Sequence, residues 1–131
     1  MPKIAKSPKA AIKKELFASG KVSAEVPYKK GVREGAGKMF YESGELYAKE
    51  TYKAGKLNGP TITYYSTGKI QAELNYKNGL LDGLCKEYYL NGKLESETEY
   101  AAGKKEGSAK IYAETGALEK KLVYKDDKLI P

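Results

Sequence analysis

The chain has 131 residues, of which 40% are hydrophobic, and carries a formal net charge of +7. It has no histidine and only one cysteine, so the commonest general base and metal ligand is missing and no internal disulfide can form. No apolar run approaches the roughly 18 residues of a membrane-spanning helix, and the first residues lack the apolar core of a signal peptide. These features argue against an enzyme, a metal protein and a helical integral membrane protein.

The chain begins with a basic segment, residues 1–15, in which five lysines stand against one glutamate. Ser7-Pro8 followed by KAAIKKELF resembles a helix start with proline at the first position. We expect this segment to be a tail or a cap of the array that follows, and a short helix and a flexible lead-in both remain open for it. A lysine-rich tail is also a handle for an anionic membrane or for nucleic acid. Nucleic acid is less favoured, because no arginine or aromatic residue is interleaved with the charges.

From Leu16 onward the chain repeats every 24 residues without insertion or deletion. Because the phase never breaks, we expect one repeat array with no linker between domains. Each full unit opens with a tyrosine, and the same residue opens the final partial unit: Tyr28, Tyr52, Tyr76, Tyr100 and Tyr124. The array comprises a half unit (16–27), full units (28–51, 52–75, 76–99, 100–123) and a partial unit (124–131).

Thirteen of the fourteen glycines follow the same period. One set stands in Ser-Gly, Thr-Gly or Asn-Gly pairs: Gly20, Gly44, Gly68, Gly92 and Gly116. A second set stands in Lys-Gly, Ala-Gly or Asn-Gly pairs: Gly31, Gly55, Gly79 and Gly103. Such pairs favour two-residue type I′ loops, in which both residues need positive φ, so each unit is predicted to be one β-hairpin. In the last unit Asp126-Asp127 replaces the second pair and tolerates this turn less well, so we expect the array to fray or stop there.

Two-residue loops would keep alternate residues on one face of the sheet through every turn. One face then carries mostly small, apolar and aromatic side chains, with Ile70 and Leu94 among them and Glu50 and Lys120 as misfits. The other face is polar, with Gln71 on it, apart from one aromatic row: Phe40, Tyr64, Tyr88 and Tyr112. A bulge at the third set of glycines (Gly35, Gly59, Gly83 and Gly107) could shift the following strand. The predicted fold is all-β, an elongated single-layer antiparallel sheet of tandem 24-residue hairpins.

Other reactive side chains have structural interpretations. Cys85 falls on the apolar face and is predicted to be a small packing residue. Three glutamates, Glu95, Glu97 and Glu99, alternate along one strand and would share the polar face, where a carboxylate pair is conceivable. Cross-strand ion pairs with Lys86 and Lys110 are favoured instead. We therefore expect no catalytic residue, cofactor, metal or small-molecule substrate.

The segment YKNGLLDGLCKEYYLNGKLESETEYAAGKKEG, Tyr76 to Gly107, resembles the variant form of the MORN repeat, as found in the YwqK-like bacterial antitoxin family. The resemblance extends over residues 16–129. It implies a run of β-hairpins in one twisted sheet and, in bacterial members, an antitoxin of a toxin-antitoxin system, whereas eukaryotic relatives are membrane-associated or protein-binding scaffolds. The chain departs from the pattern at Ala113, at Ala101-Ala102 and at Asp127.

Two functions from different classes follow. The first is a non-enzymatic protein-binding module, with a cognate toxin as the partner that the resemblance implies. Its apolar face would hold the partner through five tyrosines, because tyrosine is a large anchor with few rotatable bonds: Tyr52, Tyr65, Tyr76, Tyr89 and Tyr100. The competing interpretation is that these rings only stack on adjacent strands and support a thin sheet.

The alternative is a membrane- or cell-surface-associated scaffold that binds anionic surfaces through the basic tail and the lysines at the turns: Lys29, Lys53, Lys56, Lys77, Lys93 and Lys125. A purely structural array is a third interpretation. As written, the sequence predicts a cytoplasmic protein, and an envelope or exported one if an N-terminal signal has been removed.

Overall fold

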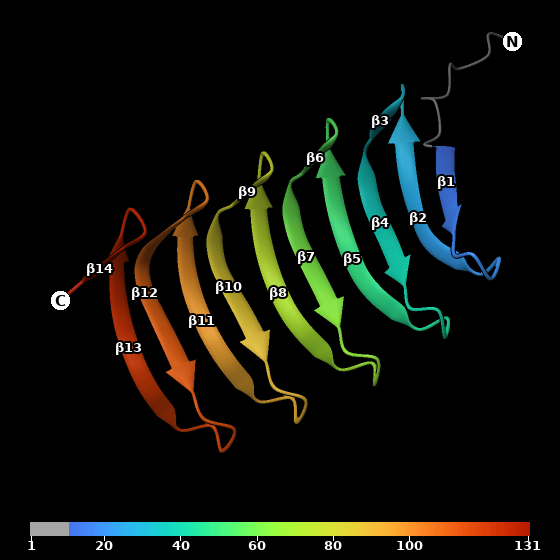
Figure 1. Cartoon of the computed structure of the whole chain (residues 1–131). Helices are drawn as coiled ribbons and strands as arrows, with labels where there is room; N and C mark the ends of the chain where they lie inside the picture. The colour runs from blue at the N-terminus through green and yellow to red at the C-terminus, as the bar shows by residue number, and fades with distance from the viewer. Residues whose placement is uncertain (1–10) are drawn as a thin grey trace, which may run out of the picture.

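The computed structural model of the chain describes residues 11–131, and all regular structure in that range is β (Figure 1). The strands form one open antiparallel sheet of 14 strands. Their bounds are β1 Ala11–Leu16, β2 Val22–Lys29, β3 Val32–Arg33, β4 Gly35–Phe40, β5 Leu46–Lys53, β6 Lys56–Leu57, β7 Gly59–Tyr64, β8 Ile70–Lys77, β9 Leu80–Leu81, β10 Gly83–Tyr88, β11 Leu94–Ala101, β12 Lys104–Tyr112, β13 Leu118–Lys125 and β14 Lys128–Ile130.

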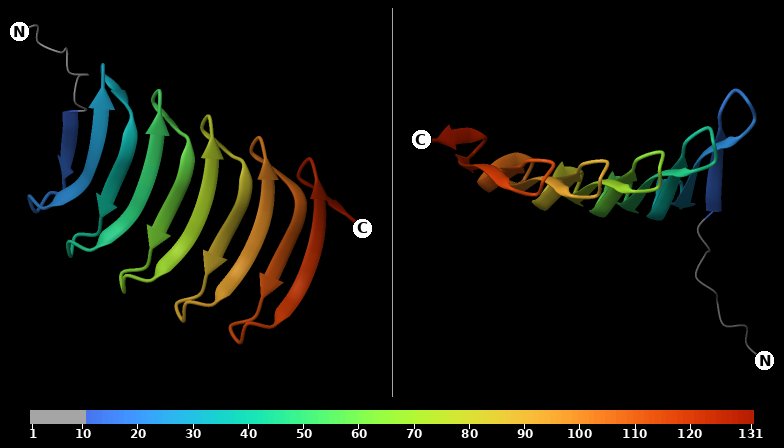
Figure 2. Two further views of the ribbon diagram at one scale, coloured as in Figure 1. Left: turned by 180° about the vertical axis from the view of Figure 1, so that it is seen from behind. Right: turned by 90° about the horizontal axis from the view of Figure 1, so that it is seen from below.

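Successive hairpins lie side by side in chain order, so almost every contact between elements joins neighbours in the sequence. Seen from below, the sheet is one layer thick and gently curved (Figure 2). The predicted fold class is therefore confirmed. The sheet has two long rims, one at each end of the strands, and both rims consist of tight connections (Figure 1).

The first rim, called the turn rim, holds the two-residue turns at the top of Figure 1. Asn78 and Gly79 have φ values of 51° and 83°, the type I′ geometry predicted for this set. Asp126 and Asp127 adopt the same geometry, with φ of 50° and 67°, and close the hairpin of β13 and β14. The expected fraying was wrong, because Glu106 Oε2 accepts the Asp126 N–H at 2.7 Å and Asp127 Oδ1 accepts the Lys105 N–H at 2.7 Å.

The opposite rim, called the loop rim, does not have the predicted two-residue turns. In the loop after β7, the Tyr65 N–H donates to the Lys69 carbonyl at 2.8 Å and the Gly68 N–H to the Tyr65 carbonyl at 2.9 Å. Gly68 alone in this loop has positive φ, at 91°. This is a three-residue loop, a β-turn followed by a left-handed glycine. Ser-Gly and Thr-Gly pairs suit both loop types, so the sequence pattern did not separate them.

A three-residue loop shifts the alternation of the two faces by one residue. A β-bulge beside each of these loops restores the alternation. Thr63 pairs with Ala72 but Tyr64 pairs with Ile70, which leaves Gln71 as the extra residue. Paired residues share a face, so Ile70 lies with Tyr64 on the opposite face from Ala72. The same shift places Leu94 opposite Tyr88. The predicted face was thus wrong for Ile70 and Leu94, and Gln71 changes places with Ile70.

The bulge at the third glycine set is also present but leaves the faces unchanged. Tyr52 pairs with Leu57, and Ala48 pairs with Thr63. Between these pairs, the segment from Leu57 to Thr63 is two residues longer than the segment from Ala48 to Tyr52. An even offset keeps alternation intact. Gly59 sits at this point with φ of 112°, a conformation that L side chains rarely adopt.

The structure describes only the last residues of the N-terminal basic segment. Residues 1–10 of this segment lie outside the described residues. The stretch KAAIKKELF, for which a short helix was one of two alternatives, begins among them. Its described part, Ala11–Leu16, is strand β1 and pairs with β2. Lys13 Nζ lies 4.3 Å from the centre of the Tyr28 ring. Pairing with an existing strand edge supplies a ladder of backbone hydrogen bonds, which outweighs a weak local preference for helix.

Hydrogen bonds also join the four turns from Ala54-Gly55 onward to the preceding repeat. The Asn78 N–H donates to Asn58 Oδ1 at 3.0 Å, and the Gly79 N–H to the Leu57 carbonyl at 2.8 Å. We call this pair of bonds a rim clamp. Equivalent side chains accept from the first residue of the other turns: Glu34 from Ala54, Asp82 from Ala102 and Glu106 from Asp126. These four clamps each fasten a repeat to the one before it.

The buried residues form a thin stripe on one face: Ala24, Val26, Ala48, Tyr52, Thr61, Ala72, Cys85 and Ala109. Most are small, and no large side chain within residues 11–131 is fully buried. Cys85 is buried, which confirms its predicted packing role. Gly37, the one glycine outside the period, makes room for an aromatic ring, because a Cβ there would lie 3.1 Å from Tyr52 Cε2.

The clamp predicts a specific pattern of stability. Asp82→Ala should lower the free energy of unfolding by about 1 kcal/mol, because the Ala102 N–H loses its acceptor. Asp82→Asn should have little effect, since Asn58 makes the same bond in the previous repeat. Urea denaturation of the three proteins measures both values. Equal losses in the two variants would show that the charge of Asp82, not its hydrogen bond, matters.

Candidate binding face

One face of the sheet carries the tyrosines that open the repeats, and we call it the tyrosine face. Tyr76 pairs with Gly59 and Tyr100 with Gly83 in neighbouring strands. Paired residues point to the same side, so each ring has a partner without a side chain and can lie across the strand. The face therefore presents a regular row of phenol rings: Tyr28, Tyr52, Tyr76, Tyr100 and Tyr124.

The rings of this row are not equally accessible. Tyr52 is 5% exposed and packs with Ala24 and Val26, with Met39 and Leu57 alongside. Tyr76 and Tyr100 are only half-buried. Gly37 has no side chain, so the Tyr52 ring can lie deeper than the rings of Tyr76 and Tyr100. Thr61 and Cys85 stand at the positions equivalent to Gly37 in the next two repeats.

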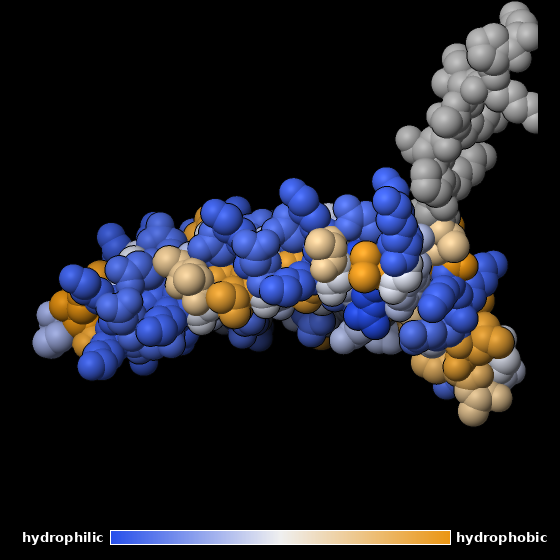
Figure 3. Space-filling model, turned by 90° about the horizontal axis from the view of Figure 1, so that it is seen from above, coloured by the Kyte–Doolittle hydropathy of each residue, from blue (hydrophilic) through white to orange (hydrophobic). Residues whose placement is uncertain are grey.

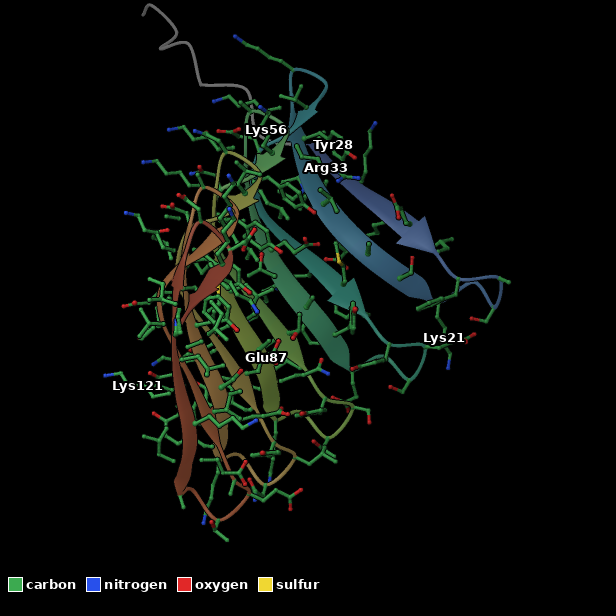
Figure 4. The ribbon with its side chains drawn as sticks, turned by 60° about the vertical axis from the view of Figure 1, so that its left-hand side comes forward. Lys21, Tyr28, Arg33, Lys56, Glu87 and Lys121 are labelled. Carbon is green, nitrogen blue, oxygen red and sulfur yellow. The ribbon has the colours of Figure 1, made fainter. Side chains whose placement is uncertain are left out.

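The ends of the tyrosine row are covered by cations. The Arg33 guanidinium lies 5.3 Å from the centre of the Tyr52 ring, and Lys105 Nζ lies 4.9 Å from that of Tyr124. Figure 4 shows Arg33 beside Tyr28, and its Nε donates to the Tyr28 hydroxyl at 3.2 Å. Leu57 and Leu81 stand at the equivalent positions of the two central repeats. Apolar leucines thus replace the cation beside Tyr76 and Tyr100, while the carboxylates of Glu50 and Glu87 act on these two rings from the same face.

Tyr65 and Tyr89, also predicted as partner-binding residues, lie on this face nearer the loop rim. The Tyr65 hydroxyl donates to the Tyr88 carbonyl at 2.5 Å, and the Tyr89 hydroxyl to the Tyr112 carbonyl at 2.6 Å. Tyr41 makes the same bond to Tyr64. Each bond links one repeat to the next, so these hydroxyls have a structural role. We call these three bonds the hydroxyl ladder. Its sequence signal was the position of each tyrosine directly after the aromatic residue that ends a strand.

The charged residues do not form the predicted arrangement of three aligned glutamates. The bulge in β11 puts Glu95 next to Ser96, opposite Glu87 on the tyrosine face. Glu97 stays on the opposite face, where its register neighbours are Lys86 and Lys110. The lysines beside Glu97 are those predicted. Within residues 11–131, no three His, Cys, Asp or Glu side chains come together as metal ligands would.

The lysines of the alternative hypothesis divide between the two rims. Lys29, Lys53, Lys56, Lys77 and Lys125 lie on the turn rim and are exposed. Lys93 lies on the loop rim, where its Nζ donates to the Thr115 carbonyl at 3.1 Å. The turn rim, viewed from above in Figure 3, is mostly hydrophilic with apolar side chains between the charged ones. No helix in the part of the chain that the structure describes is long and apolar enough to cross a membrane.

Burial changes the acidity of the tyrosine row. It is the main cause that raises the pKa of Tyr52 to about 12, and the nearby Glu50 carboxylate adds to the effect. Burial also raises the pKa of Tyr76 and of Tyr100 above the ordinary value. Desolvation disfavours the phenolate, so these phenols stay protonated and can donate hydrogen bonds at neutral pH.

Tyr52 should make stability depend on alkaline pH. Its pKa is near 10 in the unfolded chain and about 12 in the folded one, so its contribution is complete below pH 10 and is lost as the pH rises towards 12. Denaturation between these pH values should show a fall in stability that is smaller in Tyr52→Phe. Absorbance of the phenolate should show one fewer late-titrating group in this variant; an unchanged titration would contradict the assignment.

The hydroxyl ladder predicts that Tyr65→Phe lowers the free energy of unfolding by about 1 kcal/mol, since the Tyr88 carbonyl loses a donor. Tyr47→Phe is the matched control, because Tyr47 is 42% exposed and its ring packs edge-on against Tyr41. Chemical denaturation measures both changes. If Tyr65→Phe is as stable as Tyr47→Phe, the hydroxyl ladder does not stabilise the fold.

The sequence matches the family described as MORN repeat variant four times, over residues 33–54, 57–78, 81–102 and 105–126. No curated protein matches the chain. Each matched span runs from just before a clamp residue to the turn residue that it binds, for example from Asn58 to Asn78. The matched spans cover well over half of the sequence and follow the 24-residue period. The chain therefore belongs to the MORN repeat variant family.

Proposed function

We propose that this chain is a non-enzymatic protein-binding module that holds its partner on the tyrosine face. MORN repeats are generally modules that bind proteins or membranes. The observation that carries the choice of a protein is the centre of this face, where Tyr76 and Tyr100 remain half-exposed beside leucines and where carboxylates, not cations, lie near the rings. Rigid aromatic rings that are partly buried before binding lose little side-chain entropy in a complex.

The five predicted tyrosines take different parts in this proposal. Tyr76 and Tyr100 provide the contact area, with Leu57 and Leu81 beside them. Tyr52 is too deeply buried to contact a partner over most of its ring and supports the surface from below. Tyr65 and Tyr89 are held by their hydroxyl bonds, so they offer a fixed ring face at the margin.

A toxin neutralised by this surface is the more specific form of the proposal. It rests on the resemblance to the YwqK-like antitoxin family. The alternative function, attachment to an anionic surface, is favoured by the exposed lysines along the turn rim. Such attachment would be electrostatic and would weaken strongly as salt concentration rises.

The double variant Tyr76→Ala/Tyr100→Ala tests the proposal. The purified chain is used as bait in a lysate of its source organism, and the captured protein is identified by mass spectrometry and then purified. Its affinity, measured by calorimetry, should fall by about 2 kcal/mol or more in the double variant, as for truncated anchor residues. Circular dichroism and urea denaturation must first show that the variant is folded.

The matched control is Tyr112→Ala, which removes a half-buried tyrosine from the opposite face. Binding should survive in this variant. Equal losses in both variants, or a folded double variant that binds as tightly as the natural chain, would contradict the proposed face. Salt-sensitive binding to anionic vesicles without a captured protein would favour the alternative function.

A further inference from the structure

A polar groove of about 750 Å³ lies on the turn rim between the second and third full repeats. It separates the turn Ala54-Gly55 from the turn Asn78-Gly79, and we call it the central rim groove. Figure 4 shows Lys56 at the same end of the sheet as Tyr28 and Arg33, far from Glu87. The charged and amide side chains around the groove are Lys53, Lys56, Asn58, Asn75, Lys77, Asn78 and Asp82, and Tyr76 of the tyrosine face also lines it.

Hydrogen bonds already made leave mainly donors for a ligand in this groove. Asn58 Oδ1 accepts the Asn78 N–H, so its Nδ2 group is the end available to a ligand. Asp82 lines the groove, but its Oδ1 accepts the Ala102 N–H of the following turn. Asn75 Nδ2 donates to the Leu84 carbonyl, so its Oδ1 is left as an acceptor. Three lysine ammonium groups, which can only donate, outnumber this oxygen and the single carboxylate of the lining. Such a set is complementary to carboxylates.

The clamp residue distinguishes this groove from the other gaps of the rim. The equivalent clamps use Glu34, Asp82 and Glu106, which bring a negative charge to their gaps. Here the clamp is the neutral Asn58, so Asp82 is the one carboxylate among the residues that line the central rim groove. Lys56 also differs from its equivalents in other repeats. Its aliphatic carbons lie against the next turn, because a Cβ placed on Gly79 would be 4.0 Å from Lys56 Cβ and Cδ. The corresponding neighbours of Gly55 and Gly103 are the uncharged Val32 and Leu80.

We propose that the central rim groove binds an acidic polypeptide segment, with Lys53, Lys56 and Lys77 pairing with its carboxylates and Asn58 Nδ2 donating to it. This interaction surface goes beyond the tyrosine face and rests on the proposed protein-binding function. A segment with several glutamates or aspartates on a protein partner is the occupant.

The neighbouring gaps favour a narrow chain over a flat anionic surface. One repeat further along, the residues equivalent to Lys53, Asn58, Asn75 and Asp82 are Lys77, Asp82, Glu99 and Glu106, so three carboxylates replace two amides and one carboxylate. A membrane pressed against the whole rim would meet these carboxylates, and like charges in contact are unfavourable. An extended peptide that lies in one groove avoids them.

Asn58→Asp is the sharpest test, because Asp82 shows that aspartate can form the same clamp. The variant should stay folded while it adds a negative charge to the groove. Binding of a short fluorescent oligoglutamate peptide, measured by anisotropy at low ionic strength, should weaken by about fivefold in Asn58→Asp and similarly in Lys56→Ala. Lys104→Ala is the matched control, two repeats along the same rim, and should bind like the natural chain.

Three results would overturn the proposal. The first is that the natural chain binds no peptide. The second is that Lys104→Ala weakens binding as much as Lys56→Ala, which would indicate diffuse attraction by the whole rim. The third is that Asn58→Asp is folded and binds the peptide normally. Anionic vesicles and single-stranded DNA serve as further probes, and the proposal also fails if either requires Asn58 while the peptide does not bind. Failure here leaves the Tyr76/Tyr100 test untouched, because that test uses the captured partner and not the peptide.

Discussion

The central constraint on this molecule is that a sheet one strand thick has no sealed interior. Its buried residues are mostly small, such as Ala48 and Ala72, and even Tyr52 packs in an open stripe. Hydrophobic burial is therefore limited, and each repeat depends on hydrogen bonds to its neighbours. Four rim clamps connect neighbouring hairpins at one end of the strands, and the hydroxyls of three tyrosines connect them at the other end.

These structural bonds decide which tyrosines remain for function. Tyr65 and Tyr89 are committed to the backbone of the next repeat, and Tyr52 is committed to the stripe of buried residues. Tyr76 and Tyr100 have no such hydroxyl bond among the interactions described for residues 11–131. They lie between the cation-covered ends of the row, and this position makes the centre of the face the best candidate for binding.

The period of the sequence predicted most of the fold, because hairpin length and turn type depend on local residues. Asn78-Gly79 specified its turn directly. At the loop rim, Thr67-Gly68 was compatible with two loops, and the sheet adopted the longer one with a compensating bulge at Gln71. That exchange moved Ile70 to the other face. The clamp of Asn58 was missed because an amide on a polar face resembles any solvent-exposed side chain.

The same limit applies to the candidate sites. The tyrosine rows were visible as a pattern, but burial and hydroxyl partners depend on what lies in the next repeat, 24 residues away. Gly37 illustrates this dependence, since its missing side chain determines the depth of Tyr52. Charge alone also identified too many lysines, because Lys93 lies on the loop rim, away from the others.

Hydrogen exchange of the turn amides tests most directly whether neighbouring repeats hold the sheet together. In a simple hairpin turn these amides face water and exchange rapidly, whereas the clamps give the Asn78 and Gly79 N–H groups acceptors in the preceding repeat. The account predicts that both amides are protected as strongly as those in strand β8. Exchange at the rate of an open loop would contradict it and would leave the array without its proposed connections.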